Sequence, residues 1–234
     1  MTNNFLSKRQ IKSSILVRIK NLSSPCLIAL SIFSASVSSS QSAEETKMAT
    51  ETIETDTIIV AGGCFWCVES DYEKFPGVIE AVSGYTGGYT ENPTYKDVTS
   101  KPTGHYEAVE ITFDTSKTSA KELIEYFWLT IDPTDDRGQF CDKGPSYKTA
   151  LFYQSEEQQQ VFSESLENLK QNKPFKNDIV TPILPAKKFY VAEKYHQDFY
   201  KKSPIRYNYY RKGCGRDARI KQLYGKVASK DLSS

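Results

Sequence analysis

The sequence predicts one mixed α+β domain in which helices flank a mixed, mostly antiparallel sheet. Segments typical of strands and helices follow one another in the order strand, helix, strand, strand, helix, strand, helix. At 234 residues the chain has room for one domain with a hydrophobic core, and two domains would be cramped. Ser119 with Glu122, and Ser155 with Gln158, are pairs typical of capping boxes, so they mark the starts of two helices.

The first element carries the most informative local geometry. Residues 57–60 form a short apolar run typical of a central strand, and Gly62-Gly63 ends it just before a helical stretch from Cys64 to about Tyr72. This order of strand, glycine turn and helix places Cys64 on the first turn of a helix.

The later elements follow from alternation, capping and turn residues. The Gly-, Pro- and Tyr-rich residues 84–104 predict a loop of a length usual for functional or disordered segments. Beyond Pro204 the chain is aromatic and basic, without clean periodicity. The other predicted elements are strands over 78–83, 105–113, 149–153 and near Ile179, and helices from Ser119 to near Asp132, from Ser155 to about Asn172 and over 192–200.

Residues 1–43 are predicted to be an export leader, or signal peptide, outside the fold. They carry five basic residues and an apolar run over 27–37, and the first acidic residue is Glu44. The run is too short to span a bilayer, which takes about 20 residues, and small residues over 38–43 offer cleavage sites. An uncleaved amphipathic anchor and an organelle transit peptide are the alternatives. We therefore expect a periplasmic or secreted protein with no stable membrane span after cleavage.

The remaining boundaries follow from composition. Residues 44–54 are acidic and Thr-rich, typical of a linker, so the domain is expected over 55–225 with a flexible tail at 226–234. Loss of the leader subtracts five positive charges from the formal net charge of +1, which leaves −4. This charge does not suggest a nucleic-acid partner.

Cys64 is the candidate nucleophile. At the start of a helix, unpaired backbone N–H groups and the positive end of the dipole stabilise a thiolate. Helix N-termini can lower a cysteine pKa from about 8.5 to roughly 3.5–7.5, so a large thiolate fraction is expected at neutral pH. A buried, inert thiol is the alternative.

Cys64 and Cys67 also have the Cys-x-x-Cys spacing of disulfide oxidoreductases, in which the second thiol resolves a mixed disulfide formed at the first. Thioredoxins carry Trp before the first cysteine, whereas here Phe65 and Trp66 stand between the two. These bulky aromatic residues are more typical of pocket walls.

Four cysteines remain after the leader leaves with Cys26, and in an oxidising compartment they can form structural disulfides. A zinc site is a weaker alternative, because Cys64 and Cys67 lack a second clustered pair. The other possible zinc ligands are Cys141, Cys214, His105 and His196.

Glu107 is the candidate general acid. In the strand over 105–113, alternation places it on the same face as Val109 and Ile111, toward an apolar core. A buried carboxyl without a cationic partner has a raised pKa, so it stays protonated and can donate a proton. A carboxylate at a strand end, paired with solvent or a lysine, is the alternative.

Several ordered blocks of the sequence carry a family resemblance. They are GGCFW at 62–66, GYTGG at 84–88, NPTY at 92–95, GHYEAV at 104–109, DPT at 132–134 and DKGPSY at 142–147. Together they resemble the A-type peptide methionine sulfoxide reductases over about residues 57–222. The resemblance implies a two-layer sandwich related to the ferredoxin-like plan, with long loops and a wrapped C-terminal tail.

The resemblance also implies roles for single residues. Cys64 would be the nucleophile, and Glu107 would protonate the sulfoxide oxygen. The implied substrate-binding residues are Phe65 and Trp66, which hold the sulfoxide methyl group, Tyr95 and Tyr147, which hydrogen-bond the oxygen, and Asp142, which positions water or substrate.

The resolving thiol stays open, because the commonest family pattern has Gly where Cys67 stands. We favour Cys214, since Gly213 and Gly215 flank it and family members often recycle through C-terminal cysteines. Cys67, about one helical turn from Cys64, and Cys141 are the alternatives.

The expected reaction is reduction of methionine S-sulfoxide, free or in proteins, to methionine through a Cys64 sulfenic acid and an intramolecular disulfide. The resemblance implies a thioredoxin-like reductant, no metal or organic cofactor, and a role in repair of oxidised proteins; we expect a monomer. The rivals are a general disulfide oxidoreductase and a redox-responsive binding module whose aromatic tail docks a partner.

Overall fold

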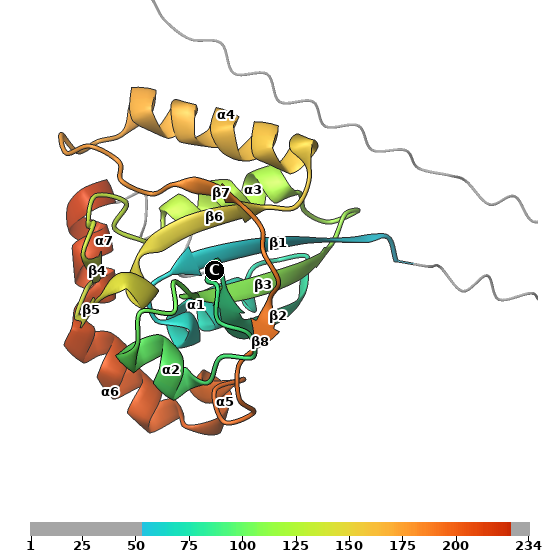
Figure 1. Cartoon of the computed structure of the whole chain (residues 1–234). Coiled ribbons are helices and arrows are strands. Elements are labelled where there is room, and N and C mark those ends of the chain that lie inside the picture. The colour runs from blue at the N-terminus through green and yellow to red at the C-terminus, as the bar shows by residue number, and fades with distance from the viewer. Residues whose placement is uncertain (1–52, 226–234) are drawn as a thin grey trace, which may run out of the picture. The chain divides into compact units, whose positions relative to one another are not determined.

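A six-stranded sheet forms the centre of the structure, a computed structural model that describes residues 53–225 (Figure 1). The strand order is β7-β6-β1-β3-β2-β8, and all neighbours pair antiparallel except β6 with β7. The predicted mixed, mostly antiparallel sheet is therefore confirmed. Its strands are β1 (Thr55–Gly62), β2 (Val78–Thr86), β3 (Tyr106–Asp114), β6 (Thr149–Tyr153), β7 (Ile183–Pro185) and β8 (Tyr190–Val191), and a separate hairpin consists of β4 (Gly138–Gln139) and β5 (Asp142–Lys143).

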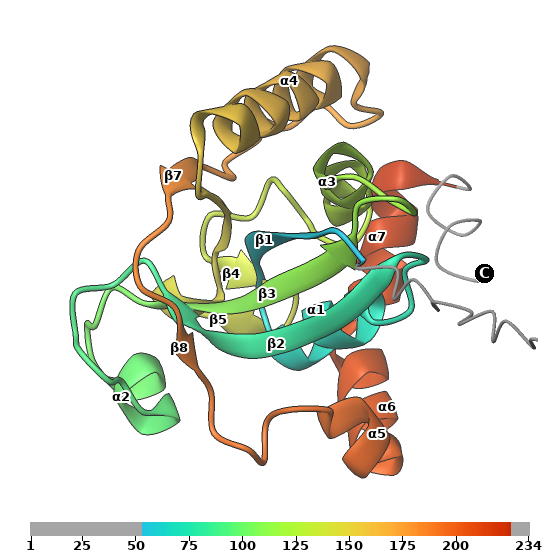
Figure 2. The ribbon, with the colours of Figure 1, turned by 90° about the vertical axis from the view of Figure 1, so that its right-hand side faces the viewer.

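Three helices pack on one face of the sheet, namely α1 (Phe65–Tyr72), α3 (Ala120–Trp128) and α4 (Glu156–Asn172). Ile58 and Val60 of β1 belong to the core on this side, whereas Ile59 and Ala61 face the other side. There they pack with Phe152 of β6 and with part of the segment that leads to β8. Figure 2 shows α3 and α4 next to each other above the strands, which agrees with the predicted two layers.

The predicted helix starts at Ser119 and Ser155 are confirmed. The hydroxyl of Ser119 accepts a hydrogen bond from the Glu122 N–H (3.3 Å), and that of Ser155 accepts one from the Gln158 N–H (3.2 Å). Helix α3 ends at Trp128, earlier than the predicted end near Asp132. Both the N–H and the hydroxyl of Thr130 donate to the Phe127 carbonyl, which closes the last turn.

Residues 84–104 contain more structure than the predicted loop. Strand β2 continues to Thr86, because Gly84 and Tyr85 pair with β8. A short helix, α2 (Tyr95–Ser100), begins at Thr94, which forms a capping box with Asp97. A helix of this length gives no clear periodic signal in the sequence.

The predicted helix over 192–200 is largely wrong. Only Phe199–Lys202 is helical (α5), and residues 194–198 form turns. Asp198 has a left-handed φ of 54°, and the side chain of Gln197 accepts a hydrogen bond from the backbone N–H of Ser83 (3.0 Å). These tertiary contacts replace the helical ones.

The segment beyond Pro204, for which no element was predicted, forms α6 (Pro204–Cys214) and α7 (Arg216–Tyr224). Gly215, with a φ of 71°, separates them. Tyr207 is the single buried residue of α6, which explains why no apolar periodicity marks it. The strand predicted near Ile179 lies instead at Ile183–Pro185, where Ile183 pairs with Leu151.

The predicted leader over 1–43, most of the linker and the tail at 226–234 lie outside the described residues. Within 53–225, every helix is too short or too polar to cross a bilayer.

Candidate active site

Cys64 occupies the turn between β1 and α1, where it is the N-cap residue of α1 and is 5% exposed. The preceding Gly63 has a φ of 82°, and a Cβ at this position would lie 2.5 Å from the Cβ of Gln139. Only glycine fits this turn, because any side chain at position 63 would collide with Gln139. The predicted strand, glycine turn and helix are confirmed.

Glu107 lies in β3 with 1% exposure, and its Oε2 accepts a hydrogen bond from the backbone N–H of Phe65 (3.1 Å). This bond places the carboxyl beside Cys64. Burial raises the pKa of Glu107 to about 8, with the charges of Asp142 and Cys67 acting in the same direction. The predicted burial of this carboxyl is confirmed, and the direction of its pKa shift agrees with the predicted proton donor.

The pKa of Cys64 shifts in the opposite direction to the predicted lowering. Burial raises the pKa of the Cys64 thiol, and its hydrogen bond with Cys67 adds to this shift. A hydrogen bond with Tyr210 opposes it. The N–H group of Phe65, at the helix start, already binds Glu107 (3.1 Å), so it does not stabilise a thiolate.

Cys67 is the nearest second thiol, since its side chain hydrogen-bonds with that of Cys64. This hydrogen bond, together with the charges of Arg216 and Arg211, lowers the pKa of Cys67 to about 7 against the opposing effect of burial.

The two tyrosines predicted to bind the sulfoxide oxygen lie beside the carboxyl of Glu107. The hydroxyls of Tyr95 and Tyr147 hydrogen-bond with each other, and Tyr147 also hydrogen-bonds with Glu107. The backbone N–H of Tyr95 is held by the carboxylate of Glu193 (2.9 Å). Burial raises the pKa of both phenols, so they remain hydrogen-bond donors at neutral pH.

Phe65 and Trp66 form an aromatic cluster with His196. The ring centroids of Phe65 and His196 are 4.9 Å apart. The indole N–H of Trp66 donates to Nδ1 of His196 (3.1 Å), and the indole stacks on Phe199 with centroids 3.8 Å apart. The cluster provides the apolar wall that was predicted from the two aromatic residues.

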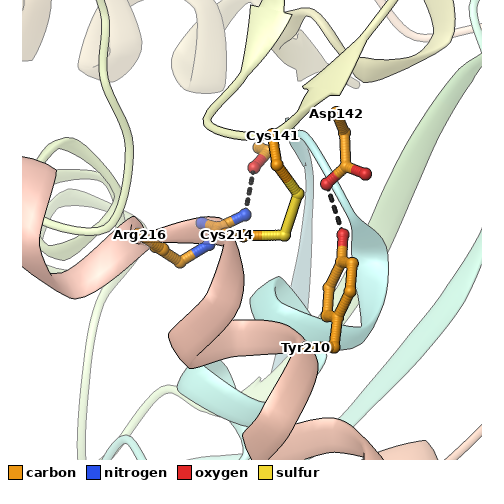
Figure 3. The surroundings of a disulfide bond; sticks show 6 residues. Cys141, Asp142, Tyr210, Cys214 and Arg216 are labelled. Carbon is orange, nitrogen blue, oxygen red and sulfur yellow. Dashed lines mark hydrogen bonds between the residues drawn. A yellow bond between two sulfur atoms is a disulfide. The ribbon is translucent and has the colours of Figure 1, made fainter.

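The C-terminal helix α6 contributes Tyr210 to the site, and Figure 3 shows this side chain next to Asp142 and the disulfide of Cys214. The hydroxyl of Tyr210 donates to the carboxylate of Asp142 and hydrogen-bonds with Cys64. Cys214, one turn further along α6, is bonded to Cys141, whereas Cys64 and Cys67 are free. The favoured resolving thiol is thus already paired in this structure.

The structure brings Cys64, Glu107 and all five predicted substrate-binding residues together. Sequence reasoning missed Tyr210 and Phe199, and it treated His196 only as a possible zinc ligand. Their one sequence signal was the aromatic composition of the C-terminal stretch. Among residues 53–225, Cys64 and Cys67 belong to no group of three possible metal ligands, whereas Cys141 and Cys214 lie together with Asp142 and are joined as a disulfide.

A thiol, a carboxyl with a raised pKa and two phenols beside an aromatic cluster can attack an electrophilic centre and protonate the oxygen that leaves it. Comparison with known proteins agrees with this chemistry. Residues 56–228 match the family model described as "Peptide methionine sulfoxide reductase".

Two curated relatives share about half of their residues with the chain. "Peptide methionine sulfoxide reductase MsrA 2" of Caulobacter vibrioides is 49% identical over 171 residues, which covers 73% of this chain and 86% of the relative. "Peptide methionine sulfoxide reductase MsrA" of Bacillus licheniformis is 50% identical over 166 residues, which covers 71% and 92%.

Solved structures show the same fold. The reduced form of Mxr1 from Saccharomyces cerevisiae has a TM-score of 0.61 at 29% identity, with 65% of this chain and 87% of that chain covered. Methionine sulfoxide reductase A of Corynebacterium diphtheriae has a TM-score of 0.58 at 29% identity, with 66% and 78% covered.

Proposed function

Because the chain belongs to the peptide methionine sulfoxide reductase family, we propose that it reduces methionine S-sulfoxide, free or within proteins, through a sulfenic acid on Cys64. One observation carries the chemistry: the buried carboxyl of Glu107 is bonded to the backbone N–H next to Cys64 (3.1 Å). This pair supplies the nucleophile and the proton that reduction of a sulfoxide needs. The reaction repairs oxidised methionine.

In the proposed step the sulfur of Cys64 attacks the sulfoxide sulfur while Glu107 gives its proton to the oxygen. The sulfur–oxygen bond breaks, methionine leaves reduced, and the oxygen ends on Cys64 as a sulfenic acid. The proton lost by the Cys64 thiol replaces the one given by Glu107. Tyr95 and Tyr147 stay protonated beside the carboxyl and stabilise the same oxygen.

The aromatic cluster of Phe65, Trp66 and His196 can bind the apolar methyl group of methionine sulfoxide. We propose that Phe65 and Trp66 hold the methyl of the sulfoxide, because they present apolar surface beside Cys64. Asp142, held by Tyr210, positions the substrate or a water molecule near the carboxyl.

We propose Cys67, in place of the favoured Cys214, as the first resolving thiol. Cys67 hydrogen-bonds with Cys64 and has a pKa lowered to about 7 by that bond, so it can attack without a rearrangement of the chain. Cys214 is occupied by its bond to Cys141. Attack of Cys67 on the sulfenic sulfur forms the Cys64–Cys67 disulfide and releases water.

Replacing Cys67 with serine is expected to leave the first turnover intact and to lower thioredoxin-supported turnover at least about tenfold, because no adjacent thiol remains. Mass spectrometry should then find dimedone attached to Cys64 only after addition of substrate. Undiminished turnover accompanied by a Cys64–Cys214 disulfide would identify Cys214 as the resolving thiol.

The electron donor is proposed to be a thioredoxin-like dithiol, with no metal or organic cofactor, acting on a monomer. The basic and apolar pattern of residues 1–43 supports export to a periplasm or beyond. N-terminal sequencing of the purified protein that found Met1 intact would contradict cleavage.

The function is tested by giving the full chain each methionine sulfoxide epimer with dithiothreitol and measuring methionine. We expect turnover of the S epimer alone, since separate enzymes serve the two epimers. If neither epimer is reduced while insulin disulfides are, the chain acts as a general disulfide oxidoreductase through Cys64 and Cys67.

A further inference from the structure

A disulfide lies beside the candidate site, and the reaction described above does not use it. It joins Cys141, in the turn of the β4–β5 hairpin, to Cys214, the last residue of α6, across 73 residues of sequence. The nucleophile Cys64 and the proposed resolving thiol Cys67 are both free in the same structure. The disulfide therefore needs a role of its own.

Each half of the disulfide stands next to a residue that reaches the site. Asp142 follows Cys141 directly, and Tyr210 lies one helical turn before Cys214 on α6. Figure 3 shows the carboxylate of Asp142 and the hydroxyl of Tyr210 facing each other beside the sulfur atoms. The two sulfurs and a carboxylate oxygen of Asp142 all lie within 4.8 Å of one another.

These two residues in turn act on the reacting groups. The hydroxyl of Tyr210 hydrogen-bonds with the Cys64 sulfur, and its ring meets that of Trp66 edge-on with centroids 5.8 Å apart. Burial raises the pKa of Glu107, and the charge of Asp142 adds to that shift. Small displacements of either residue would therefore change the chemistry at Cys64.

Each of the two segments has its own contacts with the rest of the fold: Gln139 of β4 hydrogen-bonds with the backbone of Asp132 (2.8 Å), and Arg211 of α6 pairs with Asp71 (2.7 Å). Strands β4 and β5 have two residues each, and an isolated two-stranded hairpin is marginally stable. Tyr207 is the single buried residue of α6, and Gly215 ends that helix with a φ of 71°. Arg216 stacks on Phe140 of the hairpin (4.4 Å), but it belongs to α7. The disulfide is the covalent bond between the hairpin and α6.

We propose that the Cys141–Cys214 disulfide is a positioning cross-link of the active site, which holds Asp142 and Tyr210 together against Cys64. The inference rests on the proposed function of Cys64. In this role the disulfide stays intact during reduction of the sulfoxide and exchanges no electrons with the substrate. Breaking it loosens the contact between Tyr210 and Cys64 without removing any reacting group.

The test needs a chain in which Cys64 can react once without added reductant. Replacing Cys26 and Cys67 with serine gives such a parent chain, in which Cys64 is left without its neighbouring thiol. The parent is compared with the cross-link intact, with the cross-link opened by dithiothreitol and desalting, and with Cys141 and Cys214 also replaced by serine. Methionine formation is followed in a single turnover over a range of sulfoxide concentrations.

We expect both opened forms to show about a tenfold lower ratio of rate constant to dissociation constant than the intact parent. The opened parent carries no additional substitution, so a folding defect of the serine variant does not decide the result. Equal values for the intact and opened parent would overturn the proposal.

A second comparison separates positioning from general stability. In a Tyr210→Phe chain the positioned hydroxyl is absent, so opening the cross-link should cost less than about twofold there. A loss in the Tyr210→Phe chain as large as in the parent would show that the disulfide does not act through the contact between Tyr210 and Cys64, and it would also overturn the proposal.

The intact and opened forms of the parent and of the Tyr210→Phe chain should also be compared by the rate at which iodoacetamide alkylates Cys64, which needs no sulfoxide. Opening the Cys141–Cys214 cross-link is expected to change the alkylation rate of Cys64 in the parent and not in the Tyr210→Phe chain. A folded parent that forms no methionine, yet shows this difference, would contradict the proposed function while supporting the cross-link.

Discussion

Replacing Cys64 with serine is expected to abolish reduction of methionine sulfoxide with every electron donor. A hydroxyl is a much weaker nucleophile than a thiol and forms no sulfenic acid, so neither half of the cycle can proceed. We expect kcat to fall by at least about 1,000-fold, by analogy with removal of the nucleophile from other enzymes. The measurement is methionine formed from the S epimer with dithiothreitol.

Cys67→Ser is the matched control, because it changes a second buried cysteine in the same helix turn. It should keep the first turnover that Cys64→Ser loses. Both substitutions bury a hydroxyl in place of a thiol, so the thermal unfolding temperatures of the two variants should be lowered by similar amounts. A Cys64→Ser protein that still forms methionine at a comparable rate would remove Cys64 from the mechanism.

Local signals in the sequence predicted the parts of the fold that local forces determine. Ser119 and Ser155 cap their own helices, and Gly63 adopts a conformation that a side chain would hinder. The alternation that turned Glu107 toward the core depends only on the pleat of a strand. These features agreed with the structure because each is decided within a few residues.

The parts that failed are decided by distant contacts. The hydroxyl of Tyr210 reaches Cys64 only because α6 folds back over the start of α1, and no spacing in the sequence records this contact. The partner of His196 is also distant, because its Nδ1 accepts a hydrogen bond from the indole N–H of Trp66, 130 residues away in the sequence. The Cys141–Cys214 disulfide spans 73 residues, and connectivity among four cysteines cannot be read from their order.

Two physical effects act on the pKa of Cys64 in opposite directions. A helix start favours a thiolate, and burial opposes it. The sequence revealed the helix start but not the depth of the thiol or the use of the Phe65 N–H by Glu107. Burial is the larger effect and raises the pKa of Cys64, so the thiol proton leaves during the reaction with the substrate.

Replacing Glu107 with glutamine is expected to lower kcat for the S epimer by about 100- to 10,000-fold, the range typical for loss of a general acid. Glutamine keeps the size and can keep the hydrogen bond from the Phe65 N–H, but it has no proton of suitable acidity to give to the leaving oxygen. Turnover is measured with dithiothreitol, so that recycling by a protein donor does not limit the rate.

The pH dependence identifies the acid. Burial raises the pKa of Glu107 to about 8, and the protonated form is the active one, so the wild-type rate should fall as pH rises through about 8. Glu107→Gln should lack this fall. Glu110→Gln is the matched control, because Glu110 lies in the same strand, is half-buried and has a pKa raised by burial, yet it is absent from the site. An unchanged profile in Glu107→Gln would assign the acid to another group.

The pH dependence of the free energy of unfolding tests the protonation of Glu107 independently of activity. The pKa of Glu107 is about 8 in the fold against an ordinary value of 4.5, so the native state binds the proton more tightly than the unfolded chain. The stabilisation is complete below the unfolded value and is lost as pH rises through about 8. The free energy of unfolding of wild type minus that of Glu107→Gln should therefore decrease, by at most about 1.4 kcal/mol per pH unit, across this window. A difference that does not depend on pH would mean that Glu107 is charged in the fold and cannot be the proton donor.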